Sequence, residues 1–248
     1  MAVTLEVAGV GKDFLIPVLD SVSFTVEAGE FVCLLGPNGC GKTTLLRIIG
    51  GLEPPTRGTV TLGGEPVFGS GRHTRKVGVV FQEDRLLPWM TLRQNVELVQ
   101  TPLGRDAATR RATAHRFLAL TGLAGFEDYV PGRVSGGMRQ RAAIARALAI
   151  EPDLLLMDEP FGALDAQNRR IMQGEVRRIW RETGRTIVFV THAIEEAVAI
   201  GTTLIMLSAR PARIRELVRN DGRVERAKLI DDLNTLIMEE VERQQRAP

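Results

Sequence analysis

The sequence has few cysteines, no long apolar stretch and almost no net charge. Its two cysteines, Cys33 and Cys40, are too few for a disulfide framework and lack the spacing of zinc ligands, which favours a reduced cytosolic compartment. The longest stretch without Asp, Glu, Lys or Arg runs only from Ala197 to Ala209, whereas a membrane-spanning helix needs about 18 apolar residues. The first residues show no signal-peptide pattern. We therefore expect a chain that does not itself cross a membrane.

The charges nearly cancel, since 32 Lys and Arg residues stand against 30 Asp and Glu residues for a net charge of +2. Such a balance predicts no bulk attraction to nucleic acid or to an acidic membrane surface. The hydrophobic share of 44% and the charged share of 25% exclude disordered, collagen-like and low-complexity classes. The length of 248 residues accommodates one large domain or two small ones.

Strand patterns and helix patterns alternate along most of the chain, which predicts an α/β sheet with a mostly helical insert at about 91–150. The predicted strands are Val3–Val7, Ser21–Val26, Phe31–Leu35, Thr59–Leu62, Val77–Phe81, Leu154–Met157, Thr186–Val190 and Thr203–Leu207. Outside the insert, the predicted helices are Thr43–Ile49, Glu175–Glu182, Ile194–Ile200 and an amphipathic helix from Arg223 onward.

A glycine-rich loop follows the apolar run Phe31–Leu35 and fits the pattern G-x-x-x-x-G-K-[ST] in full. Its glycines let the backbone aim N–H groups inward, and the following helix adds its positive end. Lys42 supplies a charge for the β- and γ-phosphates, and the Thr43 hydroxyl can ligate Mg²⁺. A glycine-rich turn with a chance lysine is disfavoured by the strand and helix on either side. The predicted nucleotide-binding residues are Gly36, Pro37, Asn38, Gly39, Cys40, Gly41, Lys42, Thr43 and Thr44.

Two carboxylates, Asp158 and Glu159, follow the apolar strand Leu154–Met157. Ligands of open α/β sheets bind beyond the carboxyl ends of the strands. We therefore expect Asp158 to hold Mg²⁺ and Glu159 to orient or deprotonate an attacking water. A solvated acidic turn is the other interpretation, and the phosphate loop makes it less favoured.

A second anion site is indicated by Ser135, Gly136 and Gly137, at the start of a helix predicted to run to about Ile150. Serine is a strong N-cap, and the two glycines expose backbone N–H groups at the positive end of the helix. Taken alone, the segment is better explained as a capped turn than as an anion site. One chain cannot bring this segment to its own phosphate loop if the helical insert keeps them apart.

The segment resembles the signature of the ATP-binding cassette (ABC) ATPases, LSGGQ followed by a basic residue, with Val134 and Met138 departing from it. The resemblance covers about residues 3–215 and implies a P-loop NTPase (RecA-like) ABC ATPase core with an inserted α-helical subdomain. It implies one ABC ATPase domain over residues 1–248. The core would span about 1–84 and 151–215, the helical subdomain about 85–150 and a C-terminal helical tail about 223–248.

Four further residues match positions of that family in chain order. Gln82 looks like the Q-loop glutamine, which takes part in catalysis and magnesium binding, and Asp165 closes a D-loop-like Ala163-Leu164-Asp165 and belongs to the nucleotide site. His192 looks like the switch histidine that contacts the γ-phosphate, and Phe14 falls where an aromatic ring stacks on adenine. Taken singly, Gln82 and His192 are ordinary exposed residues and Phe14 is a candidate core residue. The resemblance implies four catalytic residues: Lys42, Gln82, Glu159 and His192.

Finer features resemble the ATPases of nitrate/sulfonate/taurine-type importers, among them Glu83–Thr91 and Ser208–Pro211. Ala193 departs from that subfamily, which has aspartate there. The resemblance implies an ATP- and Mg²⁺-dependent subunit that pairs head to tail with a second copy, each ATP lying between the phosphate loop of one copy and Ser135–Gly137 of the other. It also implies an integral-membrane permease, indirectly an extracytoplasmic solute-binding protein, and a peripheral place on the cytoplasmic face of the inner membrane.

The apolar cluster Leu86–Trp89 is a candidate partner site, because exposed apolar clusters mark such sites, and the resemblance implies that the partner is the permease. Burial in the core of the helical insert is the other explanation. Two other functions remain open: a soluble cassette ATPase acting on nucleic acid or ribosomes, and an exporter or lipid-trafficking ATPase. The single cassette and the near-neutral charge argue against a nucleic-acid partner. The residues do not identify the solute.

Overall fold

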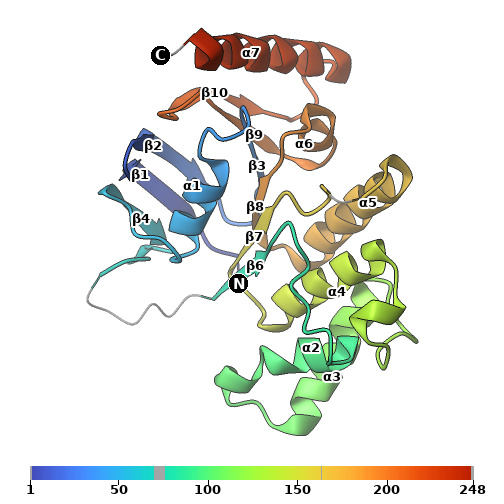
Figure 1. Cartoon of the computed structure of the whole chain (residues 1–248). Coiled ribbons are helices and arrows are strands. Elements are labelled where there is room, and N and C mark those ends of the chain that lie inside the picture. Colours follow the sequence, from blue (N-terminus) through green and yellow to red (C-terminus); the bar gives the residue numbers. More distant parts are fainter. Residues whose placement is uncertain (1, 70–75, 163, 247–248) are drawn as a thin grey trace. The chain divides into compact units, whose positions relative to one another are not determined.

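The computed structural model describes residues 2–69, 76–162 and 164–246, and the chain forms two compact units (Figure 1). Residues 76–184 form one unit, here called the middle unit. The segments 2–75 and 185–248 together form the other, here called the terminal unit. Each unit is described by itself. The predicted boundaries of core, helical subdomain and tail stay predictions.

Two sheets build the terminal unit. In the first, the antiparallel order is β2-β1-β4-β5, formed by β1 (Leu5–Asp13), β2 (Pro17–Val26), β4 (Arg57–Leu62) and β5 (Glu65–Pro66). In the second, β3 (Phe31–Leu35) pairs in parallel with β8 (Thr186–Val190) and with β9 (Thr203–Leu207), and β10 (Ile214–Arg219) pairs antiparallel with β9.

Every residue of β3, β8 and β9 is buried. A strand covered on both faces has no polar side to alternate with, which explains why these segments read as continuous apolar runs. The predicted bounds of these three strands are confirmed residue for residue. The three parallel strands end at one edge of the sheet, where β3 leads into the glycine-rich loop.

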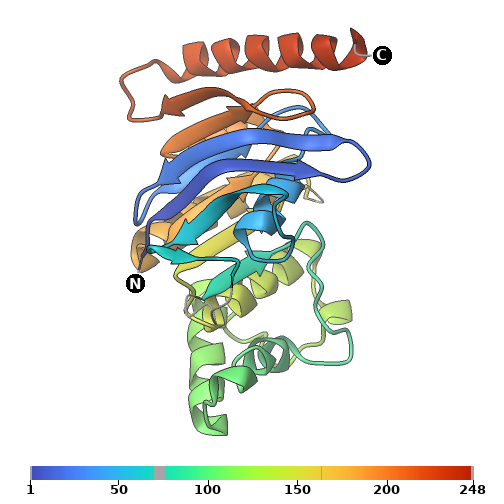
Figure 2. The same cartoon turned by 90° about the vertical axis from the view of Figure 1, so that its left-hand side faces the viewer.

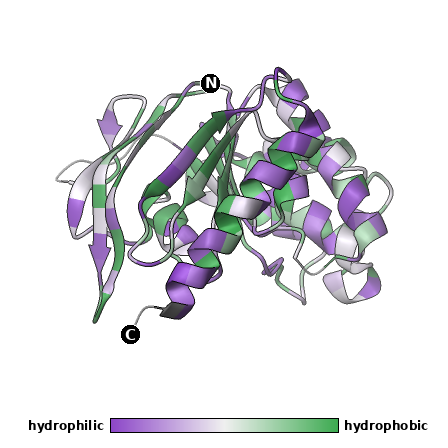
Figure 3. Ribbon diagram, turned by 90° about the horizontal axis from the view of Figure 1, so that it is seen from above, coloured by the Kyte–Doolittle hydropathy of each residue, from purple (hydrophilic) through white to green (hydrophobic). Residues whose placement is uncertain are grey.

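Three helices complete the terminal unit: α1 (Lys42–Ile49), α6 (Ile194–Ile200) and α7 (Arg226–Arg246). Helix α7 packs against α6 and runs beside β10 in both side views (Figure 1 and Figure 2). Figure 3 shows hydrophilic and hydrophobic segments alternating along α7. Its buried face includes Leu229, Leu233 and the carboxylate of Glu240, so one stripe of an otherwise charged helix meets the protein.

The middle unit pairs β6 (Val77–Val80) in parallel with β7 (Leu154–Asp158). Helices α2, α3 and α4 pack on one another, and α4 also packs on β6 and α5. The bounds are α2 (Leu92–Leu98), α3 (Ala107–Leu120), α4 (Gly136–Ala149) and α5 (Ala166–Thr183), with 3₁₀ turns at Thr101–Leu103 and Pro131–Arg133. The expected helical character of about 91–150 is therefore confirmed.

The sequence predicts several elements incompletely. The strands predicted at Val3–Val7 and Ser21–Val26 are Leu5–Asp13 and Pro17–Val26 in the structure. The prediction contained neither the two-residue β5 nor β10, whose strand is mostly exposed and carries charged residues at Arg215, Glu216 and Arg219. It also began α5 at Glu175, although the helix starts at Ala166. Residues 167–170, in the first turn of α5, are all polar or charged, and the start of the helix is set by a side-chain cap at Asp165.

Both cysteines are free and buried. Burial raises the pKa of the Cys33 thiol well above its ordinary value and raises that of Cys40 despite the nearby Lys42 ammonium. Within residues 2–69, 76–162 and 164–246, no helix has both the length and the apolar character needed to cross a bilayer.

Candidate active site

The phosphate loop is held together by its own lysine. The Lys42 ammonium, only 5% exposed, donates hydrogen bonds to the carbonyl oxygens of Gly36 at 2.8 Å and Pro37 at 3.0 Å. Gly41 has a φ of 121°, and a Cβ there would lie 2.9 Å from the side chains of Leu19 and Val18. Only glycine fits at that position, because both the backbone angle and the available space exclude a side chain.

The loop ends at the start of α1 without a competing cap. The N-cap residue of α1 is Gly41, which makes no side-chain cap hydrogen bond to the first turn. Within the loop, Gly36, Pro37 and Cys40 are buried, Asn38 and Gly39 are exposed, and Thr43 and Thr44 are half-buried. A helix N-terminus preceded by a glycine-rich turn suits an anion such as a nucleotide phosphate.

Phe14 lies at the turn between β1 and β2 with 57% of its surface exposed. The explanation of Phe14 as a core residue is therefore wrong. The Lys12 ammonium lies 4.8 Å from the ring centroid and is itself held by the Glu53 carboxylate and the Pro54 carbonyl. A cation at one face of the ring restrains it while the rest of the ring stays accessible. Stacking on adenine remains a prediction.

His192 is exposed just beyond the end of β8. The preceding residue, Thr191, donates its N–H to the Leu34 carbonyl at 3.2 Å, and its hydroxyl accepts from the Ala193 N–H at 3.0 Å. These bonds place His192 at the same carboxyl edge as the phosphate loop, which follows β3. The two parts of the site that belong to the terminal unit therefore meet at one edge of its parallel strands.

In the middle unit, Asp158 ends β7 and Glu159 follows it in a left-handed backbone conformation with φ 43°. Both residues are half-buried. The Gly162 N–H bonds to the Glu159 carbonyl at 3.1 Å, and a Cβ on Gly162 would lie 3.5 Å from the Gln82 amide nitrogen. Gln82 therefore lies beside the turn that carries the two carboxylates. A positive φ at a non-glycine residue is uncommon and is often found at functional sites.

The predicted N-cap at Ser135 is confirmed. Its hydroxyl accepts a hydrogen bond from the Met138 N–H at 3.3 Å, and Gly136 and Gly137 open α4. A Cβ on Gly137 would lie 4.0 Å from the side-chain oxygen of Asn168, so the start of α4 faces the start of α5. Sequence reasoning did not single out Asn168.

Asp165 caps α5 and is paired with Asn168. Its carboxylate accepts from the Asn168 backbone N–H at 2.9 Å and from the Asn168 side-chain amide at 2.6 Å. These bonds, the backbone one first, hold the pKa of Asp165 below its usual value. Asp165 therefore stays ionised near neutral pH. Of the predicted D-loop, Ala163 lies outside the described residues.

Comparisons with known proteins decide the family. The family model described as ABC transporter matches residues 19–162. The chain belongs to the ABC transporter family. An uncharacterized ABC transporter ATP-binding protein of Methanocaldococcus jannaschii is 46% identical over 89% of this chain and 84% of its own. The taurine import ATP-binding protein TauB of Burkholderia pseudomallei is 50% identical over 79% of this chain and 74% of its own.

Solved structures agree with this assignment. The ATP-binding cassette MJ0796, in a dimeric post-hydrolysis state bound to ADP and Pi, matches with a TM-score of 0.76 and 32% identity over 88% of this chain and 99% of that one. The predicted fold, a P-loop ABC ATPase, is confirmed, and the chain is an ABC ATPase that binds and hydrolyses ATP. The role of each individual site residue stays a prediction.

The donor set of this ABC ATPase fits a magnesium ion bound together with nucleotide phosphates. Thr43 offers a hydroxyl, Gln82 an amide oxygen and Asp158 a carboxylate. All three are hard oxygen ligands, and Mg²⁺ in nucleotide sites takes one or two such protein ligands besides phosphates and water. The described residues contain no group of three or more His, Cys, Asp or Glu side chains suited to a metal. The chemistry therefore suits an ion that arrives with ATP better than an all-protein metal cage.

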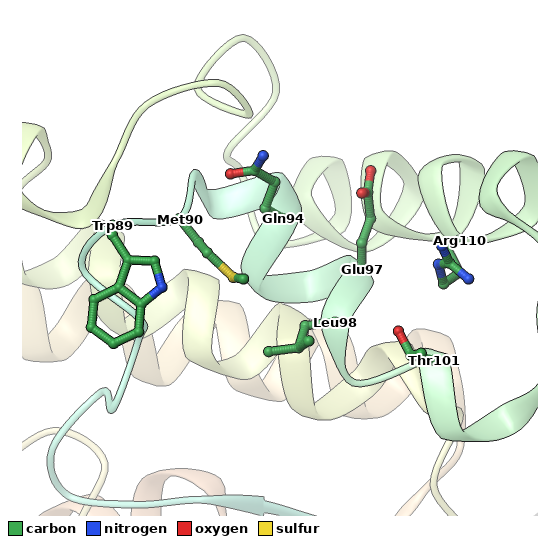
Figure 4. Close-up of a pocket in the computed structure, with 7 residues that line it drawn as sticks. All are labelled: Trp89, Met90, Gln94, Glu97, Leu98, Thr101 and Arg110. Carbon is green, nitrogen blue, oxygen red and sulfur yellow. The ribbon is translucent and has the colours of Figure 1, made fainter.

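One pocket of this ABC ATPase lies wholly in the middle unit. It has a volume of about 390 Å³ and is lined by Trp89, Met90, Gln94, Glu97, Leu98, Thr101 and Arg110 (Figure 4). Trp89 is 73% exposed, whereas Leu86 is only 7% exposed. Burial in the core therefore holds for Leu86, whereas Trp89 lies at the surface. The contact of the cluster Leu86–Trp89 with a permease stays a prediction.

Proposed function

We propose that this ABC ATPase powers an importer for a small solute of the nitrate, sulfonate or taurine kind. The permease is a separate membrane protein, and the ATPase is peripheral at the cytoplasmic face of the inner membrane. The 50% identity to a protein named for taurine import supports the importer role. An extracytoplasmic solute-binding protein belongs to the same system but touches this chain only through the permease.

Two copies act together in the proposed cycle. ATP binds to the phosphate loop of one copy, with Lys42 at the β- and γ-phosphates, Phe14 at adenine and Thr43 at the metal. Ser135 and Gly137 of the second copy complete the site. The dimeric ATP-binding cassette with ADP and Pi supports the pairing of two copies. The capped N-terminus of α4 supports it physically, since Gly136 and Gly137 lie at the positive end of the helix.

Hydrolysis in this proposal depends on positioning and charge. Thr43, Gln82 and Asp158 would hold Mg²⁺, which would supply positive charge to offset that of the nucleotide phosphates. Glu159 takes a proton from the attacking water, and His192 donates a hydrogen bond to the γ-phosphate. The turn that joins Asp158, Glu159 and Gly162 supports this assignment, because Gln82 lies against it. Asp165 belongs to the same nucleotide site.

The pocket at Trp89 carries the proposed attachment to the permease. The Trp89 indole is 73% exposed and lines the pocket with Met90 and Leu98. Such an apolar surface suits the binding of the apolar face of a short helix. Glu97 and Arg110 line the same pocket and can pair with charges beside that apolar face (Figure 4). The pocket follows Gln82 in the chain by only a few residues, so the proposed attachment lies close in sequence to the proposed catalytic glutamine.

The test is purification from native membranes of the tagged wild-type chain, Trp89→Ser and Ile171→Ser. Ile171 is a matched control, since it is 52% exposed but lies on α5 outside the pocket. We expect wild type and Ile171→Ser to retain a permease and a solute-binding protein, and Trp89→Ser to lose them. A chain that never associates with membrane proteins, or whose ATP turnover requires DNA or RNA, contradicts the importer function.

A further inference from the structure

The turn between β9 and β10, residues 208–213, touches the phosphate loop. The Arg210 guanidinium donates a hydrogen bond to the Gly39 carbonyl at 2.6 Å. The strand before the turn is equally close, since a Cβ on Gly36 would lie 2.9 Å from the Leu207 carbonyl oxygen. The turn therefore contacts the loop at Gly39 through a charge-assisted hydrogen bond, and the end of β9 lies close to the loop at Gly36.

A buried carboxylate of α7 holds this turn. Glu240 is 1% exposed, and one of its oxygens accepts a hydrogen bond from the Ala209 N–H at 2.9 Å. Its other oxygen accepts from the Arg243 guanidinium at 2.7 Å and lies 3.3 Å from that of Arg215. A buried charge persists only when its partners satisfy it, and here the three donors come from the turn, from β10 and from α7 itself.

The far end of the turn is also anchored. The Ala212 N–H donates to the Val18 carbonyl at 2.8 Å, and the Arg213 guanidinium pairs with the Asp20 carboxylate. Arg210 therefore lies between two fixed points, Ala209 on the side of α7 and Ala212 on the side of β2. Arg213 is a neighbouring cation of the same turn whose side chain bonds to Asp20 and not to the loop.

We propose that Arg210 is a positioning residue of the nucleotide site and that Glu240 makes ATP affinity depend on the docking of α7. The carbonyl and the N–H of one peptide unit point in opposite directions. A guanidinium that holds the Gly39 carbonyl outward therefore holds the Cys40 N–H inward, where it bonds to the Pro37 carbonyl at 3.3 Å. Lys42 bonds to the same Pro37 carbonyl, so Arg210 and Lys42 stabilise one loop conformation from opposite sides.

This inference rests on the proposed binding of ATP at the phosphate loop, and MgATP is the probe. Titration calorimetry on the full chain gives Kd, and steady-state turnover gives KM and kcat. We expect Arg210→Ala to raise Kd and KM about tenfold, the equivalent of one charge-assisted hydrogen bond, while kcat stays within about twofold. Arg210→Lys recovers part of the affinity. Arg213→Ala removes one anchor of the turn but leaves the bonds of Ala209 and Ala212 in place, so we expect it to raise Kd less than Arg210→Ala does.

Glu240→Gln tests the link to α7. The amide cannot satisfy all three donors, so we expect a higher Kd, and the double variant with Arg210→Ala should bind no more weakly than Arg210→Ala alone. An unchanged Kd in Arg210→Ala overturns the role of Arg210, and additive effects in the double variant overturn the link. Wild type that fails to bind MgATP, or Lys42→Ala that binds it normally, instead contradicts the proposed site. Circular dichroism confirms that each variant is folded.

Discussion

The Arg139 guanidinium lies 2.9 Å from a carboxylate oxygen of Asp84, so α4 is joined by an ion pair to the segment that follows Gln82. Arg139 also donates to the Val134 carbonyl at 3.1 Å, just before the Ser135 cap. Two turns further along α4, Arg146 donates to the backbone carbonyls of Asp84 and Arg85. Burial lowers the pKa of Arg146, although the Asp84 carboxylate opposes that shift. The start of α4 and the segment after Gln82 are thus held together within the middle unit.

A double-mutant cycle with Arg139→Ala and Asp84→Ala measures this pairing. We expect a coupling of about 0.5 kcal/mol in the free energy of unfolding, because both side chains keep more than a quarter of their exposure and solvent screens the pair. Urea denaturation of wild type, both single variants and the double variant gives the value. Strictly additive effects would show that the ion pair contributes nothing.

Glu159→Gln should bind ATP with wild-type affinity and hydrolyse it at least about 100-fold more slowly, because the amide cannot accept the proton of the attacking water. Steady-state phosphate release and nucleotide titration measure the two effects separately. Glu83→Gln is the matched control, since Glu83 is an exposed carboxylate directly after Gln82 with no proposed role. Near-normal turnover in Glu159→Gln would be evidence against Glu159 as the base.

Glu151, just after α4, pairs with two arginines, Arg116 on α3 and Arg105 just before α3. Its carboxylate lies 2.6 Å from the guanidinium groups of both Arg105 and Arg116. The bond to Arg116 lowers the pKa of Glu151 most, partial burial opposes it, and Arg105 lowers it further. Because the folded pKa is the lower one, this contribution is complete above the ordinary value of 4.5 and is lost as pH falls through the folded value.

Glu151→Gln should therefore reduce the free energy of unfolding by about 1 kcal/mol at pH 7, a figure already reduced for solvent screening. The difference from wild type should shrink below pH 4.5 and disappear once Glu151 is protonated in the folded state. Urea denaturation across that pH range tests this. Glu182→Gln, which removes a surface pair within α5, should change stability by less than about 0.5 kcal/mol. An equal difference at every pH would contradict an ionic contribution.

Gly174 lies inside α5, and a Cβ there would have nothing within 4 Å. Gly174→Ala should stabilise the protein by about 0.5–1 kcal/mol, because alanine loses less backbone entropy than glycine in a helix. Gly41→Ala is the contrasting variant, since the same change meets a positive φ and two side chains at 2.9 Å. Thermal melting ranks the two, and a destabilised Gly174→Ala would mean that the helix does not tolerate the methyl group.

Most of the candidate site could be predicted from short motifs because each carries its own local physics. Ser135 caps a helix wherever it precedes one, and Gly41 is needed wherever the loop turns with a positive φ. Gln82, His192 and Phe14 were different. Each of these is a single residue with no local pattern around it, so only the resemblance to the ABC ATPases indicates it. The structure adds that Gln82 lies beside the turn at Gly162 and that Phe14 is exposed.

The sequence by itself determined the buried strands, the phosphate loop and the capped start of α4, because burial periodicity and backbone requirements are properties of a few consecutive residues. Only the tertiary structure decided which side chains meet across long separations. It paired Arg210 with Gly39, placed Glu240 under the turn at Ala209, and separated a buried Leu86 from an exposed Trp89. Such contacts depend on how the whole chain folds, and a local sequence pattern does not predict them.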